Sequence, residues 1–117
     1  MKPVEIANTI LKQIQHSRVG DNSGALLMMC WGVHNISTVG KDKYHYGGVQ
    51  FMVNGFKHKG WVSIKLHYND SYTVTFLDKY DRFCEGPDVY EYILFPELAE
   101  FLDKHIETGV KEEEVPQ

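Results

Sequence analysis

The stretch GWVSIKLHYNDSYTVTF, residues 60–76, decides the fold. On both sides of residues 69–71, every second residue is apolar. Such alternation is typical of a β-strand with one buried face. The polar residues between the two halves are few, so the stretch predicts an antiparallel hairpin. Its inward side chains are expected to be Val62, Ile64, Leu66, Tyr68, Tyr72, Val74 and Phe76.

The segment before this hairpin shows the same alternation. Val49, Phe51 and Val53 alternate with Gln50, Met52 and Asn54. Asn54 and Gly55 then form a strong turn signal, because this pair suits tight turns between antiparallel strands. The sequence therefore predicts a β-meander rather than an isolated hairpin.

Two amphipathic helices flank the strands. Residues 3–16 carry an apolar stripe at helical spacing, and Pro3 suits a first turn. A second helix is expected from Pro96 to about residue 108, and Gly109 is its stop signal. The apolar stripes comprise Val4, Ile6, Ala7, Ile10, Leu11 and Ile14 in the first helix and Leu98, Phe101, Leu102 and Ile106 in the second.

The remaining segments give weaker signals. The continuous apolar run at residues 25–31 predicts a strand covered on both faces, with Cys30 buried inside it. Residues 32–43 are expected to be irregular, and residues 20–24 a loop. Residues 78–87 fit either an extension of the preceding strand or a hairpin. Residues 90–94 fit either a short edge strand or a helical turn.

These elements assemble into one α+β domain spanning residues 1–117, with 109–117 as a flexible acidic tail. A sheet with one apolar face must be covered, and each helix offers one apolar stripe. We expect a two-layer sandwich in which an antiparallel β-meander of about four to five strands carries the N-terminal and C-terminal helices on one face. The shared core is Val49, Phe51, Val53, Val62, Ile64, Leu66, Val74, Phe76, Ile10, Ile14, Leu98, Phe101 and Leu102.

The opposite face of this sheet is the first candidate binding surface. Most of its residues are polar, but Met52 and Trp61 are not, and tryptophan is enriched at interface hot spots. The surface suits a foreign protein or a second copy of the chain. Alternatively, Trp61 folds over an edge or beneath residues 32–43. The outward residues are Gln50, Met52, Trp61, Ser63, Lys65, His67, Thr73 and Thr75.

Charge is unevenly distributed along the chain. Residues 1–77 hold eight Lys/Arg and four Asp/Glu, a net +4, and residues 78–117 hold four and twelve, a net −8. On the second helix, acidic residues step by three or four and are expected to share the solvent face. Such a row would imitate nucleic-acid phosphates, or simply solvate the helix. The row is Glu97, Glu100, Asp103 and Glu107.

Catalytic, metal and cofactor motifs are not found. The six histidines lack zinc-site spacing, and no G-x-S-x-G, P-loop or G-x-G-x-x-G pattern occurs. We therefore expect a protein that is not an enzyme and takes no cofactor. Two cysteines, Cys30 and Cys84, without a signal sequence or an 18-residue apolar run favour a cytoplasmic location and no membrane contact. A disulfide between the two stays open.

A nucleic-acid-binding module is the alternative function. Lysines interleave with aromatics between residues 41 and 67, the mixture that single-strand binders use for stacking and phosphate neutralisation. The net charge of −4 counts against it, since such binders are usually basic. The set is Lys41, Lys43, Lys57, Lys59 and Lys65 with Tyr44, Tyr46, Phe56 and Trp61.

Several of these segments together resemble a known group. They are residues 7–14, 29–35 and 49–53, the pattern G-x-V-x-I-x-L at residues 60–66, and D-x-Y-x-V-x-F at residues 70–76. This combination is similar to a group of small uncharacterised proteins of phages and mobile genetic elements.

The resemblance covers roughly residues 6–106, and the chain departs from the group at residues 83–95. It carries no catalytic residues. What it implies is an accessory protein that acts by binding a host or phage protein, with inhibition of a host defence enzyme as one such role.

Overall fold

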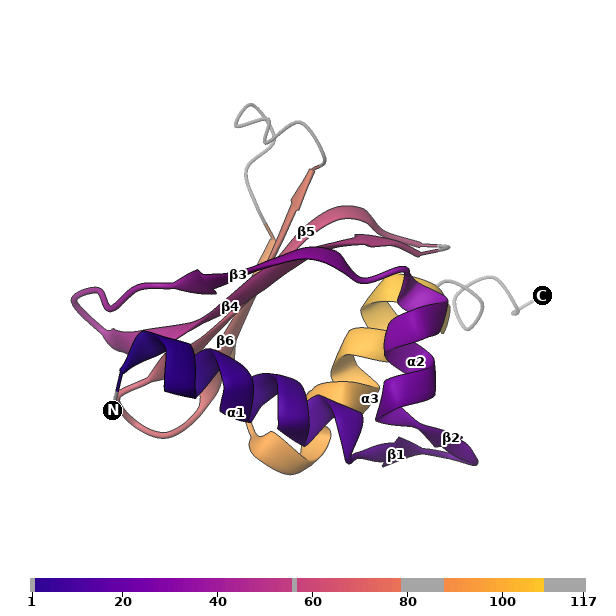
Figure 1. Ribbon diagram of the computed structural model, residues 1–117, viewed down its shortest axis with the longest axis horizontal. Helices are drawn as coiled ribbons and strands as arrows, with labels where there is room; N and C mark the ends of the chain where they lie inside the picture. Colours follow the sequence, from indigo (N-terminus) through magenta and orange to yellow (C-terminus); the bar gives the residue numbers. More distant parts are fainter. Residues whose placement is uncertain (1, 56, 79–87, 109–117) are drawn as a thin grey trace.

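The computed structural model describes residues 2–55, 57–78 and 88–108. Within them, five strands form one antiparallel sheet in the order β3-β4-β5-β6-β7, so each strand pairs with the next one along the chain (Figure 1). The expected antiparallel meander is thereby confirmed. Its strands are β3 (His34–Val39), β4 (His45–Asn54), β5 (Lys59–His67), β6 (Tyr72–Asp78) and β7 (Asp88–Ile93).

The strand register brings the predicted core residues into line. Ile64 pairs with Val49 on β4 and with Val74 on β6, and all three are fully buried. The next inward row joins Phe51, Val62 and Phe76 in the same way. The alternation in the sequence therefore gave the correct register. A slip of one residue would have turned every apolar side chain outward.

Helix α1 (Pro3–Gln15) covers the apolar face of the sheet, as expected. Ile6, Ile10 and Ile14 lie four residues apart and are buried in the core. At the helix start, the Glu5 carboxylate accepts the Lys2 amide at 3.1 Å. The helix thus begins where Pro3 indicated.

The C-terminal helix consists of three consecutive segments of different helix type. They are the 3₁₀ helix η1 (Phe95–Glu97), the α-helix α3 (Leu98–Asp103) and the π-helix η2 (Lys104–Thr108). Leu98, Leu102 and Ile106 are buried in the shared core, which confirms the predicted stripe. The Ile106 carbonyl accepts the amides of Lys57 at 2.7 Å and His58 at 3.2 Å. The turn between β4 and β5 is therefore hydrogen-bonded to the end of this helix.

The strand predicted at residues 25–31 is wrong, because the segment forms helix α2 (Gly24–Trp31). Ser23 caps its N-terminus by accepting the Leu26 amide, and Gly32 ends it with φ of 70°. The helix is apolar all round, so no helical period was visible in its sequence. The overlooked signal was the pair of capping residues, Ser23 before the apolar run and Gly32 after it.

Burial along α2 also corrects the prediction for Cys30. Leu27, Met28 and Trp31 are buried, whereas Leu26, Met29 and Cys30 are exposed. Cys30 carries a free thiol. Its expected partner in the alternative disulfide, Cys84, lies outside the described residues.

Other loop predictions need smaller corrections. The segment expected to be irregular contains edge strand β3, and residues 18–23 form a small hairpin of β1 (Arg18–Val19) and β2 (Asn22–Ser23). β3 was not predicted, because five of its six residues are exposed. Such a strand has no buried side, and its sequence therefore shows no alternation of polar and apolar residues. Residues 90–94 belong mostly to edge strand β7. The uncertain segment 79–87 and the acidic tail 109–117 lie outside the described residues.

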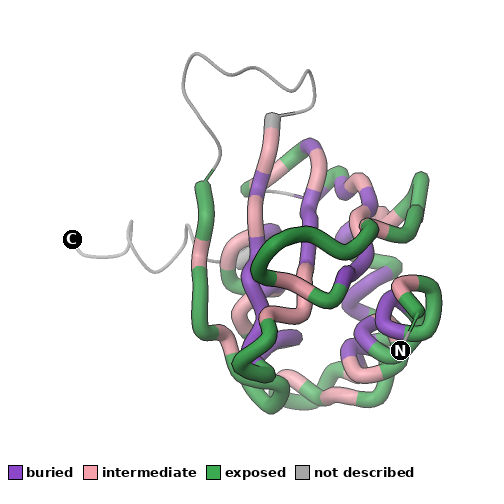
Figure 2. Tube along the Cα trace, turned by 90° about the vertical axis from the view of Figure 1, so that its left-hand side faces the viewer, coloured by how far each residue is buried: buried purple, intermediate pink, exposed green. Residues whose placement is uncertain are grey.

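All three α-helices lie on one side of the sheet (Figure 1). The central strands hold most of the buried sheet residues, and the edge strands β3 and β7 are mainly exposed (Figure 2). We call the side of the sheet that faces the helices the inner face and the other side the outer face. In the part of the chain that the structure describes, no helix lies over the outer face.

Candidate functional site

The outer face is the candidate site, and its residues are those that the alternation placed there. They are not freely solvated, however: Ser63 and Thr73 are buried, and the others are half-buried. Ser63 stands in register between Gln50 and Thr75, so its small side chain is flanked by larger cross-strand neighbours. The residues are Gln50, Met52, Trp61, Ser63, Lys65, His67, Thr73 and Thr75.

One end of this face is apolar. Met52 and Trp61 are cross-strand partners on β4 and β5, and both are half-buried. Next to them is a cavity of about 220 Å³. Its lining includes Met52, Asn54 and Lys59, together with His34 of the edge strand. We call this the Met52–Trp61 end.

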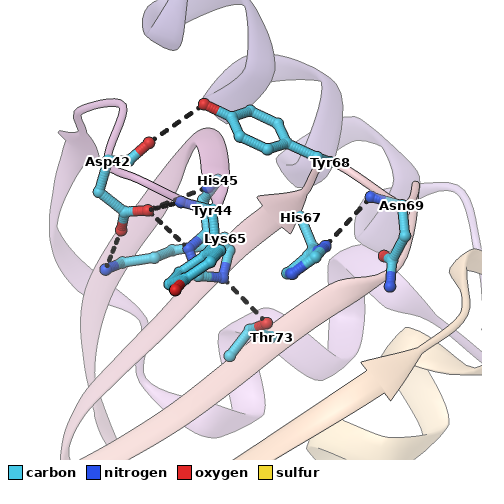
Figure 3. Close-up of polar contacts among 8 residues, drawn as sticks. All are labelled: Asp42, Tyr44, His45, Lys65, His67, Tyr68, Asn69 and Thr73. Carbon is cyan, nitrogen blue, oxygen red and sulfur yellow. Dashed lines mark hydrogen bonds and ion pairs between the residues drawn. The ribbon is translucent and has the colours of Figure 1, made fainter.

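The other end is organised by Asp42, in the turn between β3 and β4 (Figure 3). Its Oδ1 atom accepts the amides of Tyr44 and His45, each at 2.9 Å, and its Oδ2 atom accepts Lys65 Nζ at 3.1 Å. An aspartate that binds amides two and three residues ahead fixes a turn through its own side chain. Asp42 thereby holds the turn against β5.

The charge of Asp42 is stabilised by these bonds. Burial by itself would raise the pKa of this carboxyl group, but hydrogen bonds from His45, the Tyr44 amide and Lys65 outweigh that effect. The pKa of Asp42 therefore lies well below its usual range. The carboxylate remains ionised at neutral pH, and its hydrogen bonds are charge-assisted.

His45 connects this turn to β6. Its Nδ1 atom donates to Asp42 Oδ1 at 2.8 Å, and its Nε2 atom lies 3.1 Å from Thr73 Oγ1. The order Asp–His–Thr matches that of a hydrolase triad, which requires an accessible hydroxyl. The Thr73 residue is buried, with an exposed fraction of 8%. We assign the chain of bonds a positioning role.

Aromatic rings gather around the Asp42 turn. The Tyr44 and His67 rings are nearly parallel, with centroids 6.4 Å apart, and the Tyr46 and Tyr68 rings meet edge to face at 4.6 Å. The three tyrosines are exposed. Lys43 Nζ lies 5.5 Å from the Tyr44 ring centroid. We call Lys41, Lys43, Tyr44, Tyr46, Lys65, His67 and Tyr68 the tyrosine–lysine end.

Tyr68 was predicted as an inward residue of the strand, but it is exposed and does not belong to the core. β5 ends at His67, and Tyr68 begins the following turn, where its hydroxyl donates to the Asp42 carbonyl at 3.2 Å. Asp42 and Tyr68 are thus site residues that sequence reasoning missed, whereas Thr73 was expected on this face. The available signal was that Asp42 is the only carboxylate among residues 34–67, beside five lysines.

The structure separates residues that the sequence analysis grouped. Met52 and Trp61 lie at one end of the outer face, and Lys65 and His67 lie toward the other. Trp61 and Lys65 are four residues apart on one strand, or about 13 Å. Lys57 and Lys59, at the β4–β5 turn, are likewise remote from Lys41 and Lys43, at the β3–β4 turn. Phe56 lies outside the described residues.

The acidic row on the C-terminal helix is only partly on the solvent face. Glu97 and Glu100 are exposed. Asp103 is half-buried, and its Oδ1 atom accepts the indole N–H of buried Trp31 at 3.0 Å. Glu107 is also half-buried. Asp103 therefore contributes to packing between α2 and α3, which weakens the case for a phosphate-like row.

Among the described residues, no three His, Cys, Asp or Glu side chains are placed to hold a metal ion. No helix within these residues is both long and apolar enough to cross a membrane. No protein-family model, curated protein or solved structure matched the chain.

Proposed function

We propose that this chain is a non-enzymatic binding protein that contacts another protein through the Met52–Trp61 end of its outer face. The observation that carries the proposal is the pair of large apolar side chains, Met52 and Trp61, half-exposed on a sheet face that no described helix covers. Apolar side chains beside a hollow are the usual anchors of a protein interface.

The surroundings of this pair indicate the partner's chemistry. Lys59 and His34 line the adjacent cavity, and the segment from residue 34 to 67 has five lysines and one carboxylate. A complementary surface would carry an apolar side chain that enters the cavity and acidic groups around it. Charge complementarity would then speed association, and the apolar contacts would supply most of the affinity.

The resemblance to small phage and mobile-element proteins supplies a biological context. It supports a cytoplasmic accessory protein that binds a host or phage protein, and inhibition of a host defence enzyme is the role we propose within that class. The exposed Glu97 and Glu100 give the opposite side of the molecule a different charge. That side is not needed for the proposed contact.

The test compares partner capture by the wild-type chain and by variants of the Met52–Trp61 end. Trp61→Ala removes the aromatic anchor, and Lys59→Glu reverses an exposed charge at the cavity. Lys65→Glu is unsuitable because it would place a second carboxylate beside Asp42. Lys12→Glu is the matched control, with the same charge change on the exposed side of α1.

The expected result is a protein retained by the wild type and Lys12→Glu but lost with Trp61→Ala and Lys59→Glu. Thermal melts of all four chains verify the fold. Sedimentation of the purified protein distinguishes a second copy from a foreign partner, since a homodimer would dissociate in the same two variants. Equal capture by all variants would contradict the proposal.

A further inference from the structure

The tyrosine–lysine end of the outer face has chemistry that protein contact at the other end does not explain. Tyr44, Tyr46 and Tyr68 are all exposed. The Tyr44 ring lies parallel to the His67 ring, and the Tyr46 and Tyr68 rings meet edge to face. We propose that this end binds single-stranded nucleic acid, with bases stacked on the tyrosine rings and phosphates beside the lysines.

The ring of Tyr44 is the best-placed stacking surface. Its backbone is held on both sides, because its amide donates to Asp42 and its carbonyl accepts the Tyr68 amide at 3.0 Å. The side chain nevertheless remains 56% exposed. An exposed ring on a backbone that is already held loses little further backbone entropy when a base stacks on it.

The orientation of the neighbouring rings supports the same use. The planes of Tyr44 and His67 differ by only 4°, so a base stacked on Tyr44 would also lie parallel to the His67 ring. His67 is oriented by the Asn69 amide, which donates to its Nδ1 atom at 3.1 Å (Figure 3). That bond leaves the ring proton of a neutral His67 on Nε2.

The charge of this end complements phosphate. Residues 41–46 and 65–68 contain Lys41, Lys43, Lys65 and one carboxylate, which gives a net +2. The carboxylate is Asp42, already engaged by Lys65 and His45. The next acidic residue along the chain, Asp70, lines a cavity beside Ile6 of α1. Lys41 and Lys43 are therefore the cations best placed for phosphates.

Single strands fit this surface better than a duplex. Exposed tyrosines can stack only on bases that are themselves unstacked, and such stacking tolerates any base sequence. The tyrosines and lysines come from two neighbouring connections, the β3–β4 turn and the end of β5, so the surface is small. We expect it to contact two or three nucleotides, within a weak site that depends on salt.

The test measures fluorescence anisotropy of a labelled oligothymidylate of about 12 nucleotides at about 50 mM and about 200 mM NaCl. We expect binding that weakens at the higher salt. Tyr44→Ala should reduce affinity about 5- to 150-fold, the range for one lost base stack, whereas Tyr44→Phe should keep it. Lys43→Gln should lower the slope of log affinity against log salt by about 0.7.

Two controls separate stacking from general attraction of anions. Tyr92→Ala removes a tyrosine that is 68% exposed on edge strand β7, two strands away from β5, and should leave affinity unchanged. A poly-glutamate peptide of similar length should compete poorly, because it offers charge without bases. The proposal is overturned if the oligonucleotide does not bind at the lower salt, if Tyr44→Ala binds like the wild type, or if poly-glutamate competes equally. None of these results bears on the protein contact at Trp61.

Discussion

Ile64 and Ser63 are neighbours on β5, and both are buried, yet they are buried in different ways. Ile64 points to the inner face and belongs to the core that the helices share. Ser63 points to the outer face, where its cross-strand neighbours shield it. Low exposure therefore does not by itself mark a core residue. What covers the side chain decides how much free energy its burial contributes.

This difference also explains how one sheet serves two purposes. On the inner face, side chains from distant parts of the chain fit together, so substitutions there affect the whole fold. On the outer face, most contacts are between adjacent strands and turns. The outer face is consequently free to carry side chains suited to the two proposed contacts, such as Trp61 and Tyr44.

The sharpest test of the comparison truncates the two neighbours on β5. Ile64→Ala should lower the free energy of unfolding by about 2–5 kcal/mol, because it leaves a cavity between sheet and helices. Ser63→Ala should change it by about 1 kcal/mol or less, because only a shielded hydroxyl is lost. Urea unfolding at neutral pH measures both. Equal losses would show that the outer face is packed as tightly as the inner one.

A second test measures where the sheet does not tolerate an added methyl group. A methyl group at Gly48 would lie 1.9 Å from the Ile64 carbonyl oxygen, whereas one at Gly40 would meet no atom within 4 Å. Gly48→Ala should therefore cost about 3 kcal/mol, because the backbone of two paired strands must shift. Gly40→Ala, the matched control, should stay within about 0.5 kcal/mol of the wild type. Thermal unfolding of both variants would check the difference.

The smallest expected effect concerns Asp42. Its pKa is lowered on folding from an unfolded value of about 3.9, so its contribution to stability is complete above that pH and declines as the pH falls below it. Because the side chain is 40% exposed, solvent screening limits this contribution to about 1 kcal/mol or less. Asp42→Asn should thus destabilise the protein at pH 7 and approach the wild type at about pH 2.

Urea midpoints at several pH values would measure this convergence. Asp21→Asn is the matched control, since Asp21 is an exposed aspartate on the β1–β2 hairpin. If Asp42→Asn and Asp21→Asn showed the same pH profile, the Asp42 turn would contribute nothing specific to the outer face.

The sequence was sufficient for the sheet and the two terminal helices because each shows a clear period. Val62, Ile64 and Leu66 alternate, and Ile6, Ile10 and Ile14 recur every fourth residue. It was insufficient for α2, which is apolar on every side, and for β3, which is mainly exposed. Periodicity identifies an element only when that element has one buried and one solvated side.

The candidate site was predicted in part. Alternation placed Met52, Trp61, Lys65 and His67 on one face, and the structure does so too. The hydrogen-bond network around Asp42 could not be predicted from alternation. Its bonds join side chains that are distant in the sequence, at residues 42, 45, 65, 68 and 73, and no local pattern specifies their positions. The separation of the two ends followed only from the strand register.

The bonds between the Ile106 carbonyl and the β4–β5 turn have a kinetic consequence. Each hairpin of the meander closes a short stretch of chain, at a small entropic cost, whereas η2 at the end of the C-terminal helix must reach a turn about 50 residues earlier. We therefore expect the hairpins to form first and the C-terminal helix to dock after the folding transition state. Leu102→Ala should then accelerate unfolding while leaving the refolding rate nearly unchanged, and stopped-flow measurements of both rates would decide the order.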